Sequence, residues 1–322
     1  MLFIPFKVDL DLHRFPFLTI LICIACIGIF MQQQSNRVAI QDSVVTFCKK
    51  QSSDSRFGLV LEKVQGKRSL GACAQLIYGI SKSEKPKAEI ERLASNADKI
   101  DAFPVSYSRQ YILESLTQKF TLFDNTNPPH DLTEKLMYAP ESFNIKNMVT
   151  AAFAHGSWSH LIGNLFFFFA FAAAVELALG FVAYTLVFLT LAMGTHLAYS
   201  FALFGVADAL PTLGLSGVVM GMIGMFAYLM PTVKIRCFMW FIIFVRILRI
   251  PAWILAAWYI GWDIYDLNHS ENQSNINFIA HVSGAGIGFV LGLFFFRRRR
   301  AEIHSEIATR KDSKKFSSAF NK

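Results

Sequence analysis

Charged residues are scarce in the second half of this chain. Residues 149–296 hold only four Lys or Arg and five Asp or Glu. A soluble domain carries charge on about a quarter of its residues, so this stretch cannot form a water-exposed surface. Over the whole chain 53% of residues are hydrophobic and 17% are charged, and the mean hydropathy is +0.39. We therefore predict a polytopic membrane protein with one polar insert, residues 33–148, which holds 16 basic and 13 acidic residues.

Cysteine is also scarce, and no nucleic-acid-binding module is present. The five cysteines show no zinc-type spacing, and only Cys48 and Cys73 lie in the insert. They can form a disulfide if the insert faces an oxidising compartment. The net charge of +8 is concentrated in the tail 297–322, which has nine basic and three acidic residues directly after an apolar run. Such a tail fits membrane orientation and anionic lipid headgroups better than nucleic acid.

Long uncharged runs predict the membrane spans, at about 20 residues for each crossing helix. Five runs are long enough: 15–36, 148–175, 177–207, 209–233 and 272–296. The first lacks a small-residue cleavage site, so we predict an uncleaved helix over 15–32 rather than a signal peptide. With one further span, the core 149–296 supplies helices two to six of an all-α, six-helix bundle.

The fifth span is interrupted by Arg246 and Arg249. Our preferred interpretation is an interfacial amphipathic segment near 235–249, followed by a span over about 250–267 in which Arg249 snorkels inward. One long helix over 237–262 is the alternative.

Basic residues predict the orientation. The tail 1–14, the loop after the fourth span and the first twenty residues of the tail 297–322 together hold fourteen Lys or Arg, whereas the opposite short loops, near 205–211 and 268–275, hold none. Basic residues stay on the cytoplasmic side, so both termini are predicted to be cytoplasmic and the insert extracytoplasmic. We expect a multi-pass protein of the plasma (inner) membrane.

Polar residues inside the spans are costly and therefore mark candidate functional sites. They form four groups, three at the predicted outer ends of spans two, four and six and one at the inner end of span two: His155, His160 and Asn164; Gly214, Ser216 and Gly217; His281 with Gly284, Gly286 and Gly288; and Glu176.

Spans two, four and six all run inward, so these outer groups lie at one depth. Ser216 and His281 are each about four residues below the outer surface, or about 6 Å at 1.5 Å per residue. The small faces Gly217-xxx-Gly221 and Gly284-xxx-Gly288 allow the two helices to approach closely. A hydroxyl, an imidazole and hydrogen-bond donors at one depth are what nucleophilic catalysis with an oxyanion hole requires.

Other polar residues have simpler explanations. We expect Glu176 to order the inner end of the bundle through hydrogen bonds, and His196 to pack. Asp263 is a possible third member beside His281, but an interfacial helix cap explains it better.

These residues together resemble the rhomboid intramembrane serine proteases. The resemblance covers about 148–296 and rests on His155, Gly156 to Ser159, His160, Asn164 and Glu176, then Gly214-Leu215-Ser216-Gly217, then Ala280-His281-Val282-Ser283-Gly284. It implies a serine–histidine dyad with Ser216 as nucleophile and His281 as base. It also implies an oxyanion hole from His160, Asn164 and the Ser216 backbone N–H. No metal or cofactor is implied, and the substrates would be single-pass membrane proteins.

The chain departs from this family at two positions. Many members have a tyrosine where this chain has Met220, and many have a Trp-Arg pair near Lys146-Asn147. We expect Met220 to be tolerated, because a thioether can also pack against imidazole. The insert is long for the family.

Two rivals to a protease remain. One is a catalytically silent relative that binds transmembrane segments, although such relatives typically lose the serine or the histidine. The other is a transporter that uses Glu176 and Asp263, but these acids lie at opposite ends of the predicted bundle. The oligomeric state and the substrate are left open.

Overall fold

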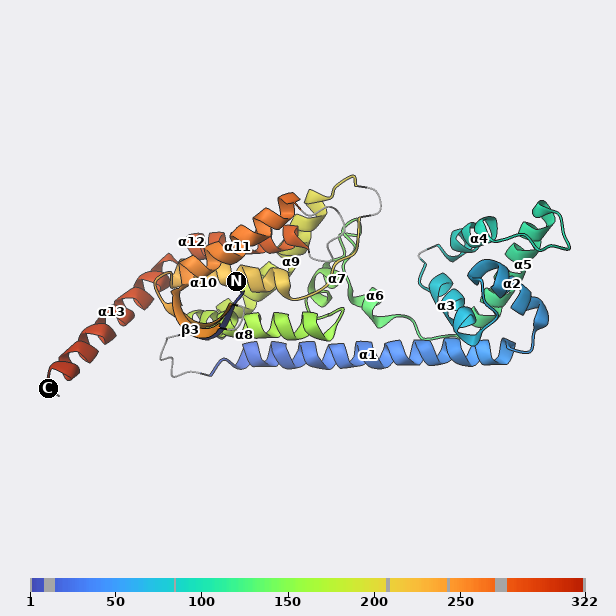
Figure 1. Cartoon of the computed structure of the whole chain (residues 1–322). Helices are drawn as coiled ribbons and strands as arrows, with labels where there is room; N and C mark the ends of the chain where they lie inside the picture. Colours follow the sequence, from blue (N-terminus) through green and yellow to red (C-terminus); the bar gives the residue numbers. More distant parts are fainter. Residues whose placement is uncertain are drawn as a thin grey trace. The chain divides into compact units, whose positions relative to one another are not determined.

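The computed structural model describes residues 2–8, 15–83, 85–206, 209–241, 244–269 and 277–320 (Figure 1). These residues form mostly helices, with one small sheet, in two compact units. One unit comprises residues 1–31 and 133–322, and the other comprises residues 32–132. Arg14, one of the basic residues used above for orientation, and the start of the uncharged run 272–296 lie outside the described residues.

The unit 32–132 is a small helical domain with its own core. It contains the last part of α1 (Phe17–Gln51), then α2 (Ser55–Gln65), α3 (Leu70–Ser81), α4 (Pro86–Asn96) and α5 (Val105–Asp124). Apolar residues from all five helices pack together, and a disulfide joins Cys48 in α1 to Cys73 in α3. Its limits differ from the predicted insert 33–148, because residues 133–148 belong with the other unit.

Helix α1 is much longer than the span predicted over 15–32. It continues for 35 residues to Gln51, and the uncharged run covers only its first part. Its start is held by Glu176 of α8, whose carboxylate accepts hydrogen bonds from the backbone N–H groups of Leu18 (2.8 Å) and Thr19 (2.7 Å) and from the Thr19 hydroxyl (2.7 Å). A carboxylate at a helix N-terminus satisfies N–H groups that lack intrahelical partners. Glu176 therefore anchors the first helix to the bundle.

The bundle consists of α1 and five further helices, which occupy the places of the predicted spans. These are α8 (Trp158–Leu179), α9 (Phe181–Ala202), α10 (Ser216–Leu229), α11 (Ala252–His269) and α12 (Phe278–Phe295). Among the described residues, α1, α8, α9 and α12 are long and apolar enough to cross a membrane. Helix α10 has only 14 residues, but nearly all of them are buried, so it lies inside the bundle.

The segment 235–249, predicted above as an interfacial amphipathic segment of an all-α protein, consists of strands. It forms a hairpin of β2 (Lys234–Phe241) and β3 (Phe244–Pro251), and β1 (Leu2–Val8) pairs antiparallel with β2 to give the order β1-β2-β3. The alternative of one helix over 237–262 is excluded by the same strands. The predicted fifth span corresponds to α11, which begins two residues later than expected, at Ala252.

Helix α13 (Arg297–Phe320) contains most of the basic tail and docks its first turns on the bundle. Arg299 donates to the Ala178 carbonyl (2.6 Å), the Arg300 guanidinium lies 4.7 Å from the centre of the Tyr228 ring, and His304 bonds the Leu229 carbonyl (3.1 Å). The basic residues near the membrane therefore also bind the ends of α8 and α10.

Candidate active site

Ser216 is the first residue of α10, and the turn before it is fixed by two neighbouring segments. The Gly214 N–H donates to the Ala151 carbonyl (2.8 Å), while Thr212 pairs with Tyr138 through two backbone hydrogen bonds of 2.8 and 2.9 Å. The first N–H groups of a helix have no intrahelical acceptor and carry partial positive charge. The half-buried Ser216 side chain therefore stands at a helix end that favours a developing negative charge.

Close packing of α10 against α12 brings His281 to Ser216. A Cβ added to Gly284 would collide with the Gly217 carbonyl, and a Cβ added to Gly288 would collide with the Gly221 carbonyl. A Cβ on Gly217 would itself lie 3.3 Å from the carbonyl oxygen of Ala280. Because Gly217 follows Ser216 and Ala280 precedes His281, the two candidate catalytic residues occupy adjoining turns of touching backbones. No hydrogen bond joins their side chains among the described residues.

Helix α8 brings His160 and Asn164 to the same turn. At Gly214 the backbone has φ +120°, which favours glycine, and a Cβ there would lie 2.7 Å from Cε1 and 2.8 Å from Nε2 of His160. The same Cβ would lie 3.5 Å from Nδ2 of Asn164. Because Gly214 has no side chain, it leaves room for the imidazole of His160 and the amide of Asn164. Gly214 lies two residues before Ser216.

Asn164 is buried, and its amide nitrogen has no hydrogen-bond partner among the described residues. A buried donor without an acceptor is destabilising by about 1–3 kcal/mol, so such a group needs an explanation. An oxyanion that forms beside Ser216 would supply the missing acceptor. His155 lies behind this pair, with its ring 5.2 Å from that of His160 in an edge-to-face arrangement and its Nδ1 bonded to the Phe153 carbonyl (3.2 Å).

His281 has a partner that the sequence analysis assigned elsewhere. Its Nδ1 lies 3.1 Å from Oδ2 of Asp263, which comes from α11. The side chains are 14% and 16% exposed, and the Phe278 ring stands edge-on 6.1 Å from the imidazole. The interpretation of Asp263 as an interfacial cap is therefore corrected, because in the structure its carboxylate faces His281. The sequence offered Asp263 as a possible partner of His281, but its spacing alone did not favour that role over a cap.

Other residues singled out in the sequence occupy buried positions in the bundle. Met220 is buried in α10 one turn after Ser216, and Gly217 contacts Thr195 of α9 as well as α12. Glu176 lies at the start of α1, as described above. His196 is buried, bonds the Ala192 carbonyl (2.6 Å) and packs against Tyr138. Among the described residues no group of His, Cys, Asp and Glu could hold a metal ion.

The departure at Lys146-Asn147 falls in a short helix, α7 (Ile145–Thr150). Asn144 caps this helix, and the Asn147 amide donates to the carbonyls of Lys135 (3.1 Å) and Met137 (2.7 Å). Thr150 adds a bond to the Leu136 carbonyl (3.0 Å). Asparagine thus ties the first loop to the chain just before Tyr138, which in turn pairs with Thr212 near the site.

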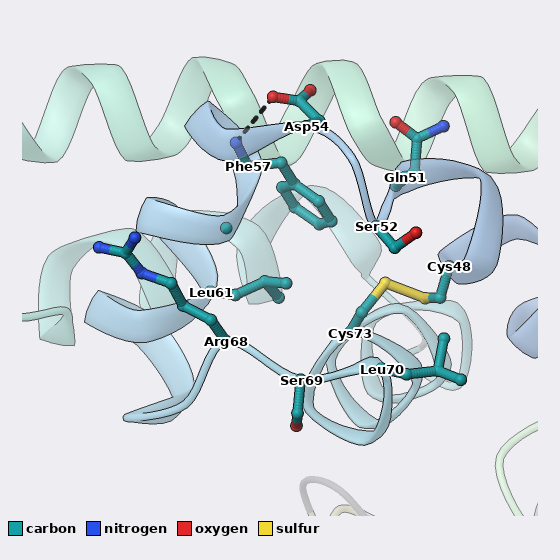
Figure 2. A pocket seen from close by; sticks show the side chains of 11 residues that line it. Cys48, Gln51, Ser52, Asp54, Phe57, Leu61, Arg68, Ser69, Leu70 and Cys73 are labelled. Carbon is teal, nitrogen blue, oxygen red and sulfur yellow. Dashed lines mark hydrogen bonds between the residues drawn. A yellow bond between two sulfur atoms is a disulfide. The ribbon is translucent and has the colours of Figure 1, made fainter.

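A pocket in the other unit is lined by groups that are already engaged. Figure 2 shows it beside the Cys48–Cys73 disulfide, with the Asp54 carboxylate bonded to the Phe57 N–H (3.1 Å). Arg68 bonds Glu62 (2.5 Å). The two cysteines are oxidised, and the side chains of Asp54 and Ser69 cap helices α2 and α3.

The comparison with known families decides the assignment of the bundle. A family model for the rhomboid domain matches residues 143–298, which include Ser216, His281, His160 and Asn164. The chain therefore contains a rhomboid domain. No curated protein matches it at a significant level. The rhomboid domain is an integral membrane helical bundle, in agreement with the apolar helices described above.

Proposed function

We propose that this rhomboid protein is an intramembrane serine endopeptidase that cleaves single-pass membrane proteins in or beside their transmembrane segment. The proposal is supported by the close approach of Gly217 to Ala280, which are the chain neighbours of Ser216 and His281, and by the buried amide nitrogen of Asn164, which has no partner among the described residues. A silent relative that only binds transmembrane segments would have no need for a buried donor beside a serine.

In the proposed mechanism Ser216 Oγ attacks the carbonyl carbon of the scissile peptide, and its proton passes to His281. The carbonyl oxygen becomes an oxyanion that accepts hydrogen bonds from the Asn164 amide, the His160 ring and the Ser216 backbone N–H. Collapse of this intermediate breaks the C–N bond, and the leaving amine takes the proton from His281. Water then hydrolyses the acyl-enzyme by the same steps, with His281 as base.

The test is turnover of a model single-span substrate by the purified full-length protein. Ser216→Ala and His281→Ala should each abolish cleavage and labelling by a fluorophosphonate, and the double variant should lose no more than either single one, because the two residues act as a unit. Both variants should retain the thermal stability of the wild type. Cleavage by either purified variant would exclude this pair, and an inactive, unlabelled wild type would favour the silent binder.

A further inference from the structure

A carboxylate on an apolar helix of the bundle is costly, and Asp263 of α11 has a specific partner. Its neighbours Trp262 and Ile264 are 49% and 45% exposed along the apolar side of the helix, whereas Asp263 turns inward to His281. Intramembrane acids are rare and usually pair with a functional group. Here the group is the imidazole of the proposed base, bonded at 3.1 Å.

The bond also determines which imidazole nitrogen carries the proton. An ionised carboxylate can only accept hydrogen bonds, so Nδ1 of His281 must be the donor. The lone pair of the neutral ring is then on Nε2, the nitrogen that is left to accept the Ser216 proton. The same carboxylate lies beside the ring when it becomes an imidazolium, and it stabilises that charge. Aspartate in soluble serine proteases does both of these things.

We infer that Asp263 is a positioning residue for His281, which makes the site of this protein a Ser216–His281–Asp263 triad rather than a dyad. The inference rests on the proposed function, and it concerns the orientation and tautomer of the base rather than contact with substrate. A third helix, α11, thereby joins α10 and α12 in building the catalytic centre.

Asp263→Asn in the full-length protein tests this inference. The change is nearly isosteric and removes a charge from a spanning helix, so the variant should fold. It should lower kcat on a model single-span substrate by about 10²-fold or more, since the corresponding change in a soluble triad costs about 10⁴-fold. KM should stay within about threefold, because Asp263 does not touch substrate. Asp263→Glu, which keeps the carboxylate, should recover at least tenfold of the loss.

Asp266→Asn is the matched control, with the same chemistry one turn further along α11, and it should turn over like the wild type. Wild-type kcat in Asp263→Asn would overturn the inference and leave the proposed function standing. An equal loss in Asp263→Asn and Asp263→Glu, or a rise in KM alone, would also overturn it, because either would indicate a packing role. If Asp263→Asn does not yield folded protein, the kcat of Asp263→Glu decides, and a value below one hundredth of wild type counts against the triad. An inactive wild type would overturn the proposed function and this inference together.

Discussion

At the scale of single residues, the buried amide of Asn164 leads to a direct prediction about turnover. Its buried amide nitrogen lacks an acceptor, and an oxyanion beside Ser216 would provide one. Asn164→Ala should therefore lower kcat by about 10- to 1,000-fold, because one oxyanion donor is lost while others remain. Thermal stability should not fall, since a buried unsatisfied donor is removed. Single-turnover cleavage of a model substrate measures the effect, with the exposed Ile162→Ala in the same helix as control. Wild-type kinetics would remove Asn164 from the oxyanion hole.

The residues of the site differ in how far the sequence predicts them. Ser216 and His281 stand at equal predicted depth in two runs whose glycines are spaced by four, so helix geometry alone predicts that they lie close together. The contact of Asp263 with His281 does not follow from helix geometry in this way, because the side of α11 on which Asp263 lies depends on where that helix begins. That start is set by the strand β3 before it, where the sequence predicted an interfacial amphipathic segment.

At the scale of the elements, the packing of α10 on α12 depends on glycines that touch backbone. Gly288→Ala would push a methyl group into the Gly221 carbonyl, so it should destabilise the protein by about 1–3 kcal/mol and slow fluorophosphonate labelling of Ser216. Gly286→Ala, two residues earlier in α12, meets nothing within 4 Å and should be neutral or slightly stabilising, because alanine favours helix over glycine. Thermal unfolding in detergent compares the two. Equal stability of both variants would contradict this account of the helix contact.

The start of α2 gives a prediction about pH. Asp54 caps this helix and accepts a bond from Lys119 (2.7 Å), which holds the pKa of its carboxyl below the usual range, with help from the Phe57 N–H. A pKa depressed by folding adds stability above the unfolded value of about 3.9, and this stability is lost as pH falls through the folded pKa. Hydrogen exchange of α2 and α5 in the full-length protein should therefore rise below about pH 4.

Asp54→Asn keeps a capping side chain but removes the charge. It should weaken this acid dependence and cost no more than about 1 kcal/mol near neutral pH, because the pair is partly exposed and screened. Asp101→Asn is the control, because the Asp101 side chain is highly exposed and its carboxylate makes only a long contact, 3.4 Å, with the Lys63 ammonium. An unchanged exchange profile in Asp54→Asn would show that other groups govern the acid response.

The sheet is the element that the sequence analysis missed, for a physical reason. Segment 235–249 is rich in Ile, Val, Phe and Trp, which favour strands, but its apolar length and three arginines also fit an interfacial amphipathic segment. Pairing decides between them, and β1 comes from residues 2–8, more than two hundred positions away. A local pattern contains no information about that partner. The length of α1 was missed differently, because the end of an uncharged run marks the edge of a membrane span and not the end of a helix.

At the scale of the whole molecule, the rhomboid domain and the helical unit 32–132 lie in different compact units. The two parts also differ in sequence, because charged residues are frequent in 33–148 and scarce in 149–296. The change from a charged to an uncharged stretch predicts that two kinds of surface exist, one for water and one for lipid. The predicted start of the insert, at 33, lies within one residue of the boundary between the compact units, which falls at 32. The second boundary falls earlier than predicted, since 133–148 is polar yet packs with the bundle through α7 and Tyr138.

The orientation of the molecule is the last prediction. Fourteen basic residues flank the membrane on one side and none on the other in the short segments, so both termini should be cytoplasmic and unit 32–132 extracytoplasmic. The Cys48–Cys73 disulfide supports this, because disulfides persist in oxidising compartments. Protease added outside intact cells or spheroplasts should cut unit 32–132 and spare a tag on the C-terminal tail. Reduction should shift the gel mobility of the wild type but not of Cys48→Ser. A protected unit with an exposed tail would reverse the topology, and it would place the start of α10, with Ser216, toward the cytoplasm.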